Sequence, residues 1–161
     1  MNERKYKILH NIFFSAFGVF LVILTVRAAH NSVPPLTLSS STSDVVRIEL
    51  NGVSILADVA HTKAQLLQGL SGKDKLLENH GMWFVFGYSD RWGIWMKDMN
   101  FPIDIVWFDE NSEIVDIKIN VSPETYPEVF YPLKESSFVL ELSSGAVEKY
   151  HLEVGNRVYL R

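Results

Sequence analysis

From residue 45 onward, short apolar runs separated by turn-forming residues recur about every 10 residues, and this rhythm restricts the possible folds strongly. Helical patterns occur only twice, after Thr62 and after Ser143 or Ser144, which are residue types that commonly cap helices. Many short strands with few helices are typical of β-sandwiches and barrels. We therefore expect a mainly β domain, a compact sandwich or barrel with two short helices. A parallel α/β sheet is disfavoured, because strands and helices do not alternate along the chain.

Two local signals mark the start of this domain. Asn51-Gly52 separates the strand-like runs 45–50 and 53–59. An Asn-Gly pair between strands favours a tight hairpin, because its turn requires positive φ at both residues. Thr62 and Gln65 have the spacing of a capping box, in which each side chain accepts a hydrogen bond from the other residue's backbone N–H. We expect the first short helix to begin there.

Residues 1–27 have a different character from the rest of the chain. Three basic residues within positions 4–7 precede an apolar run, 8–26, whose length is close to the roughly 20 residues of a membrane-spanning helix. The basic flank predicts that the N-terminus stays in the cytoplasm and that the remainder is exported. A signal anchor, a cleaved signal peptide and a buried globular helix all fit the run. Arg27 makes the possible cleavage site poor and favours the anchor.

The remainder divides into a tether and one domain. Residues 28–44 are rich in Ser, Thr and Pro, which predicts a flexible tether, and residues 45–161 have the length of a single domain. From residue 28 onward, 11 Lys and Arg oppose 18 Asp and Glu, a formal difference of −7. Nucleic acid is therefore not an expected partner, since its phosphates require the opposite sign. The chain has no cysteine, which excludes disulfides and thiolate chemistry.

The segment 93–109 carries charged residues among tryptophans and aliphatic side chains, where an unpaired charge is costly. If residues 100–101 form a two-residue hairpin loop, Lys97 faces Asp104 as a cross-strand ion pair. A loop one residue longer places Asp98 opposite Asp104, and two carboxylates at close range share a proton or bind a cation. If the flanking strands belong to different sheets, neither pairing forms.

These residues suggest a candidate binding site. Lys97 and Asp104 can line a polar notch with Trp95 as a flat wall, and Glu141 joins them if its strand lies alongside. Such a site suits an envelope glycan or another small polar ligand, because indoles stack on sugar rings. The same residues also fit an enzyme in which Asp104, Glu141 and Lys97 exchange protons. A third alternative is a structural or protein-interaction domain without a ligand site, in which Lys97 and Asp104 form a purely structural ion pair. No metal or cofactor motif occurs, so neither is predicted.

The four tryptophans are numerous for one small domain. Trp83 and Trp107 lie in strand-like apolar runs and are expected in the core. Trp92 follows two charged residues in an expected loop, and we predict that it is the most exposed of the four.

Six separated motifs follow one another along the domain. They are, in order, Thr62 with Gln68-Gly69-Leu70, Gly81 to Phe86, Trp95-Met96-Lys97, Pro102-Ile103-Asp104, Val139 to Leu142 with Gly145, and Val154-Gly155. Together they resemble one known family, the small exported bacterial and archaeal domain called domain of unknown function 192, or uncharacterised protein family 0127. The resemblance covers residues 46–160. It implies a compact β-sandwich similar to a jelly roll and an export signal, and it implies no reaction. The family's Trp-Met-Lys-Asn-Thr ends here in Asp98-Met99, and its Pro-Leu-Asp has Ile103 in the middle.

Overall fold

The computed structural model describes residues 44–161, so the predicted N-terminal helix and nearly all of the predicted tether lie outside the described residues. Within 44–161, no helix combines the length and the hydropathy that crossing a membrane requires. The elements are β1 (Val45–Leu50), β2 (Val53–Ala60), α2 (Lys63–Gln68), β3 (His80–Asp90), β4 (Ile94–Trp95), β5 (Ile103–Phe108), β6 (Ile114–Val121), the 3-10 helix η1 (Pro123–Thr125), β7 (Val129–Phe130), β8 (Ser136–Ser143), α3 (Ala146–Lys149) and β9 (Tyr159–Leu160).

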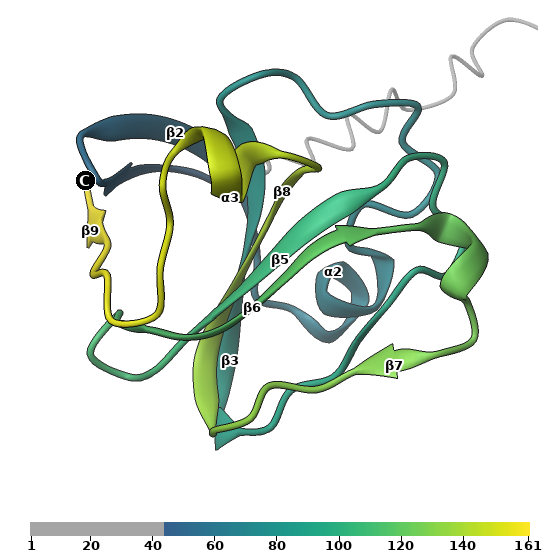
Figure 1. Cartoon of the computed structure of the whole chain (residues 1–161). Coiled ribbons are helices and arrows are strands. Elements are labelled where there is room, and N and C mark those ends of the chain that lie inside the picture. Colours follow the sequence, from purple (N-terminus) through teal and green to yellow (C-terminus); the bar gives the residue numbers. More distant parts are fainter. Residues whose placement is uncertain (1–43) are drawn as a thin grey trace, which may run out of the picture. The chain divides into compact units, whose positions relative to one another are not determined.

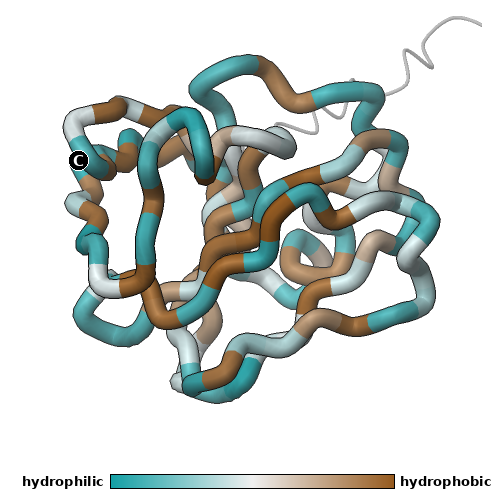
Figure 2. Tube along the Cα trace, viewed as in Figure 1, coloured by the Kyte–Doolittle hydropathy of each residue, from teal (hydrophilic) through white to brown (hydrophobic). Residues whose placement is uncertain are grey.

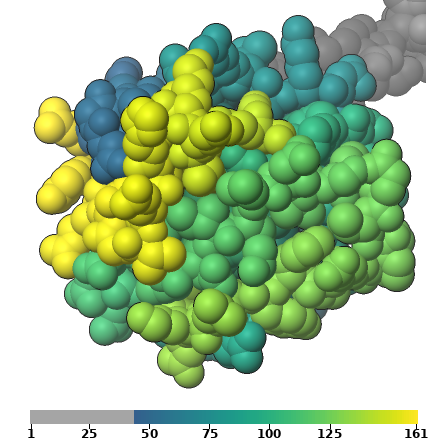
Figure 3. Space-filling view, viewed as in Figure 1, coloured from purple at the N-terminus to yellow at the C-terminus, as the bar shows by residue number. Residues whose placement is uncertain are grey.

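Seven of these strands form one sheet in the order β6-β5-β8-β3-β2-β1-β9, and β4 pairs with β7 in a second, two-stranded sheet. The larger sheet curls into a half-barrel (Figure 1). The C-terminal strand β9 pairs with β1, so the last residues, in yellow, lie against the first strands of the domain, in blue (Figure 3). The prediction of a mainly β domain with two short helices is confirmed. In place of two facing sheets of a jelly roll, one curled sheet carries most of the strands.

Both local signals at the start of the domain are confirmed. The β1–β2 hairpin turns at Asn51 and Gly52, whose φ angles are 48° and 78°. The Thr62 hydroxyl accepts from the Gln65 N–H at 3.3 Å, and the Gln65 side-chain oxygen accepts from the Thr62 N–H at 3.0 Å. This capping box starts α2, and the helix ends at Gly69.

Strands β2 and β3 run parallel, with residues 56–60 beside residues 80–84. The segment 61–79, which contains α2, is the crossover between them. The sequence pattern gave no indication of this single βαβ unit. The other pairs of the larger sheet are antiparallel, which agrees with the expectation against a parallel α/β sheet. A parallel pair needs a crossover instead of a hairpin. As a result α2 packs over one face of the sheet.

The larger sheet carries a hydrophobic core on each face. Alternate residues of a strand point to opposite faces, so Trp83, Val106 and Leu140 join the core beneath β1, β2 and α3. Their neighbours Phe84 and Val139 join the core beneath α2, β4 and β7. Both faces of β5 are therefore covered, which explains its nearly continuous apolar sequence (Figure 2).

The segment around Asn100 is not a hairpin. Only Ile94–Trp95 is a strand there, because the chain turns directly afterwards: Met99 N–H donates to the Met96 carbonyl at 3.3 Å, and Asp98 has a φ of 55°. Strand β4 pairs with β7, whereas β5 pairs with β6 and β8. Neither predicted pairing of Asp104, with Lys97 or with Asp98, is formed; the alternative of two different sheets is the one observed.

Asp104 is fully buried and holds three elements together. Its carboxylate accepts from the backbone N–H of Asn120 in β6 at 2.8 Å and from that of Val147 in α3 at 2.9 Å. The prediction that Ser143 or Ser144 caps this helix is wrong, because Gly145 occupies the cap position and makes no side-chain bond. A carboxylate from a neighbouring strand therefore satisfies the start of α3.

Replacing Asp104 by Ala should lower the free energy of unfolding by about 3 kcal/mol, because the buried Val147 N–H and the partly buried Asn120 N–H lose their acceptor. Asp104→Asn, which keeps one carbonyl acceptor, should lower it less. Urea denaturation followed by tryptophan fluorescence measures both changes. Asp74→Ala, at an exposed position, is the control and should stay within about 0.5 kcal/mol of the unsubstituted chain. An Asp104→Ala protein as stable as this control would contradict the structural role.

Candidate functional site

A small pocket opens where α2, β4 and β8 meet. Its volume is about 40 Å³, which holds roughly two or three water molecules. Most of the lining side chains are apolar, but polar atoms supply most of the surface that faces the cavity, and Glu141 on β8 supplies a carboxyl group inside. The lining residues are Leu66, Leu67, Gln68, Gly69, Leu70, Ser71, Phe84, Gly93, Ile94, Trp95, Met99 and Glu141.

Glu141 is a buried carboxyl with an oxygen that no described residue, 44–161, bonds. Its residue is 5 % exposed, and its Oε2 atom has no hydrogen bond from any residue within 44–161. Such a group is costly to bury unless something else satisfies it. A buried polar atom that the fold leaves unsatisfied, at the edge of a cavity, is the feature expected of a ligand-binding position.

Gly69 allows α2 to end directly over this carboxyl. A Cβ atom at position 69 would lie 3.2 Å from Cζ of Phe84 and 4.0 Å from Oε2 of Glu141. The residue also has a φ of 48°, which favours glycine. The close approach of the helix end closes the pocket on one side of Glu141.

Burial raises the pKa of the Glu141 carboxyl from 4.5 to about 8. The physical cause is desolvation, which penalises the charged form. At pH 7 the group is therefore mostly a neutral carboxylic acid. In that form it donates one hydrogen bond and accepts others, so it suits a hydroxyl or a carbonyl as a partner.

Trp95 lies at the mouth of the pocket with 44 % of its surface exposed. Strand β4 holds it by pairing Trp95 with Val129 of β7. The exposed side chain of Leu67 on α2 lines the same pocket. The pocket thus has an aromatic and aliphatic rim and a single carboxyl inside.

The structure brings together two of the four predicted site residues, Trp95 and Glu141. Lys97 instead forms a surface ion pair with Asp98, whose hydrogen bond raises the pKa of the lysine. Lys97 and Asp104 do not line the pocket. The predicted polar notch of Lys97, Asp104 and Trp95 is therefore not formed, because the turn after β4 directs the Lys97 side chain to its sequence neighbour Asp98.

Asp104 and Glu141 lie on opposite faces of the sheet. In the β5–β8 pairing, Ile105 is the partner of Glu141, and Asp104 is the partner of Leu142. Paired residues share a face, and consecutive residues do not. The two carboxyl groups therefore cannot share a proton, and an acid–base mechanism that combines them does not fit this geometry.

Sequence reasoning missed the contribution of α2. Gly69 and Phe84 both occur in the motifs that resemble a known family, but nothing in the sequence indicated that they meet beside Glu141. The reason is the crossover 61–79, which was not expected and which carries α2 onto β8. A prediction that β2 and β3 pair in parallel would have placed α2 beside Glu141.

Two of the remaining tryptophans are placed as predicted. Trp83 and Trp107 are buried in the two cores. Trp92 is only partly buried: it stacks on Phe86 with ring centroids 4.2 Å apart, and its indole N–H donates to the Tyr88 carbonyl. Trp95 is the more exposed residue, so the prediction for Trp92 is wrong. Within residues 44–161, no group of three or more His, Cys, Asp or Glu is placed to hold a metal ion.

Comparison with known families decides the affiliation. The family domain of unknown function 192 (DUF192, "Uncharacterized ACR") matches residues 45–160. The chain belongs to this family. No curated protein matches the DUF192 chain.

Two crystal structures resemble this DUF192 domain. One is a protein of Sinorhizobium meliloti 1021, provisionally named a transcription regulator, with 25% identity and a TM-score of 0.69 over 73% of this chain and 95% of that chain. The other is a protein of unknown function from Novosphingobium aromaticivorans DSM 12444, with 22% identity and a TM-score of 0.68 over 75% and 89%. The second likeness concerns the fold alone.

Glu141→Gln should make the domain more stable at alkaline pH. The folded protein binds the Glu141 proton more tightly than the unfolded chain, so the stability from this group is complete below pH 4.5 and is lost as the pH rises through about 8. The isosteric, neutral Gln does not titrate. The two proteins should therefore match near pH 4.5, and the Gln variant should gain roughly 4–5 kcal/mol by pH 9.

Urea denaturation of both proteins at several pH values between 5 and 9 measures this difference. Glu128→Gln changes an exposed carboxylate in the same way and should follow the unsubstituted protein. Parallel pH profiles for Glu141→Gln and the unsubstituted chain would show that the carboxyl titrates normally in the fold.

Proposed function

We propose that this DUF192 domain is a membrane-tethered, extracytoplasmic binding module whose pocket at Glu141 receives one polar group of an envelope glycan or another small polar ligand. The observation that carries the proposal is the buried Glu141 carboxyl, whose Oε2 has no partner among residues 44–161, beside the exposed indole of Trp95. Apolar pockets with one convergent polar group are the usual form of small-ligand sites.

The size of the pocket restricts what can enter. A volume of about 40 Å³ accepts a group such as a hydroxymethyl, with the size of two or three water molecules, and excludes a sugar ring. The rest of such a ligand would lie outside, across Trp95. The flat faces of sugar rings and other small cyclic molecules suit contact with an indole. The ligand therefore places one polar group in the pocket and stacks its ring on the indole of Trp95.

The charge of the ligand determines how binding should depend on pH. A neutral group that displaces water from the pocket desolvates Glu141 further and raises its pKa, so its affinity should be constant below pH 8 and fall above it. A cationic group stabilises the ionised carboxylate, so its affinity should increase as the pH rises towards 8. Because the Glu141 carboxyl is neutral at pH 7, we expect the ligand group that enters the pocket to be uncharged.

A thermal-shift screen of the full chain at pH 6.5 against sugars, alkylamines and cell-wall fragments should find ligands, which isothermal titration calorimetry then measures. Trp95→Ala should weaken binding about tenfold, since stacking contributes about 1 kcal/mol or more. Glu141→Gln keeps a donor and an acceptor and should bind within tenfold, whereas Glu141→Leu should abolish binding. Lys97→Ala, outside the pocket, is the matched control. Affinities that are unaffected by Trp95→Ala and Glu141→Leu would refute this site.

Acid catalysis by Glu141 alone is the second candidate function. The observation that favours it is the raised pKa, which keeps the carboxyl protonated at neutral pH as a general acid requires. Turnover of a bound ligand that Glu141→Gln abolishes, while calorimetry shows binding retained, would favour the enzyme. Binding without any product would favour the module.

The proposed location rests on residues 1–27. A full chain tagged at its C-terminus should remain in the membrane fraction after carbonate extraction, and external protease should degrade the domain in spheroplasts, because a basic flank keeps the N-terminus inside. Mass spectrometry should find residues 1–27 intact. A soluble periplasmic product lacking them would indicate a cleaved signal peptide, and a domain protected from external protease would contradict export.

A further inference from the structure

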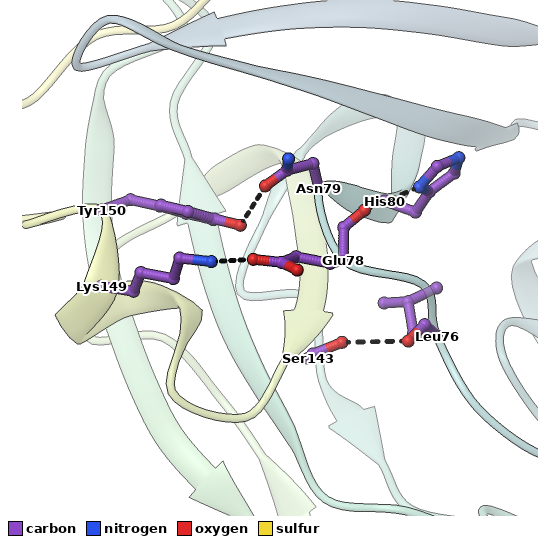
Figure 4. Close-up of polar contacts among 7 residues, drawn as sticks. All are labelled: Leu76, Glu78, Asn79, His80, Ser143, Lys149 and Tyr150. Carbon is purple, nitrogen blue, oxygen red and sulfur yellow. Dashed lines mark hydrogen bonds and ion pairs between the residues drawn. The ribbon is translucent and has the colours of Figure 1, made fainter.

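A second hollow lies between α3 and the segment 76–80, which leads into β3 (Figure 4). Its volume is about 310 Å³, at the lower end of the range of about 300–1,000 Å³ for small-molecule sites. Of its apolar lining residues, Leu76 is partly exposed, whereas Leu142 and Ala146 are 1 % and 9 % exposed. The hollow, here called the α3 groove, is distinct from the Glu141 pocket because the two share no lining residue.

Lys149 and Tyr150 each make a contact with the segment 76–80, side by side, and the Ser143 hydroxyl makes a third, long one to the Leu76 carbonyl at 3.5 Å (Figure 4). The Tyr150 hydroxyl donates to the Asn79 side-chain oxygen at 2.6 Å, and the Lys149 ammonium pairs with the Glu78 carboxylate. Tyr150 is buried, and the Asn79 carbonyl accepts from Leu56 N–H of β2, so the first contact belongs to the fixed wall of the groove.

The Lys149–Glu78 contact is exchangeable. The two side chains are 53 % and 73 % exposed, and ion pairs with that exposure add little to stability. Each partner nevertheless holds the other in its charged form, because their mutual hydrogen bond lowers the pKa of Glu78 and raises the pKa of Lys149. The groove therefore presents one carboxylate on one wall and one ammonium on the other.

We propose that the α3 groove binds a compact zwitterion of amino-acid size. The ligand's ammonium takes the place of Lys149 at Glu78, its carboxylate takes the place of Glu78 at Lys149, and its apolar part covers Leu76. One ion pair is exchanged for two. A ligand with only a negative charge would still be repelled by the carboxylate of Glu78. A ligand with only a positive charge would still be repelled by the ammonium of Lys149. A neutral ligand has no charge with which to open the pair.

L-Leucine is the probe, with its singly charged relatives 4-methylpentanoate and isoamylamine as matched controls. The ¹⁵N-labelled full chain in detergent micelles is titrated with each compound and followed by NMR. We expect saturable shifts of the amides of residues 76–80 and 143–150 with leucine. Each relative should bind about tenfold more weakly or worse, because it lacks one charge-assisted contact.

Glu78→Gln and Lys149→Gln should each weaken leucine binding about tenfold, and both positions are exposed enough for the fold to persist. Glu128→Gln and Lys134→Gln make the same charge changes at exposed positions outside the groove and should leave the affinity unchanged. Glu141→Gln should also leave it unchanged, so the result is independent of the function proposed for the Glu141 pocket.

Three results would overturn the proposal. The first is the lack of a saturable shift with leucine at tens of millimolar. The second is equal affinity for leucine and its two relatives, which would make the groove a purely apolar surface. The third is leucine binding that persists in both Glu78→Gln and Lys149→Gln.

Discussion

The coverage of β5 and β8 on both faces is the constraint on which the rest of this domain depends. Side-chain alternation sends every second residue of these strands to one core and the others to the second core. Any polar residue in the two strands is therefore buried on one particular face. Asp104 meets backbone donors from β6 and α3 on its face, whereas Glu141 meets apolar side chains and a pocket on the other.

The different hydrogen bonding of Asp104 and Glu141 indicates that the first carboxyl group is structural and that the second is the candidate for binding. Asp104 is fully satisfied by two backbone N–H groups, so its burial ties elements together. Glu141 has an unsatisfied oxygen, and desolvation keeps it neutral near pH 7, so its burial lowers stability at alkaline pH. A group that costs stability and borders a cavity is a stronger candidate for a binding role than one that stabilises the fold.

The sequence predicted local structure well where the determinants are local. The Asn51-Gly52 turn and the Thr62–Gln65 box depend on residues within a few positions of one another, and both were confirmed. The Lys97–Asp104 pair, the cap of α3 and the parallel β2–β3 pair were wrong or missed, because each depends on which strand lies beside which. The turn over residues 96–99, in which Asp98 has a φ of 55°, separates β4 from β5, and the two strands lie in different sheets.

The sequence by itself determined the mainly β class, the hairpin and helix starts, the family motifs and the presence of Trp95 and Glu141 among the candidates. Those properties follow from hydrophobic periodicity, turn chemistry and capping, which act over short distances. Only the tertiary structure decided that Glu141 shares a pocket with Trp95 and not with Asp104 or Lys97. The physical reason is that strand pairing and the α2 crossover assign each side chain to a face, and no local signal specifies that choice.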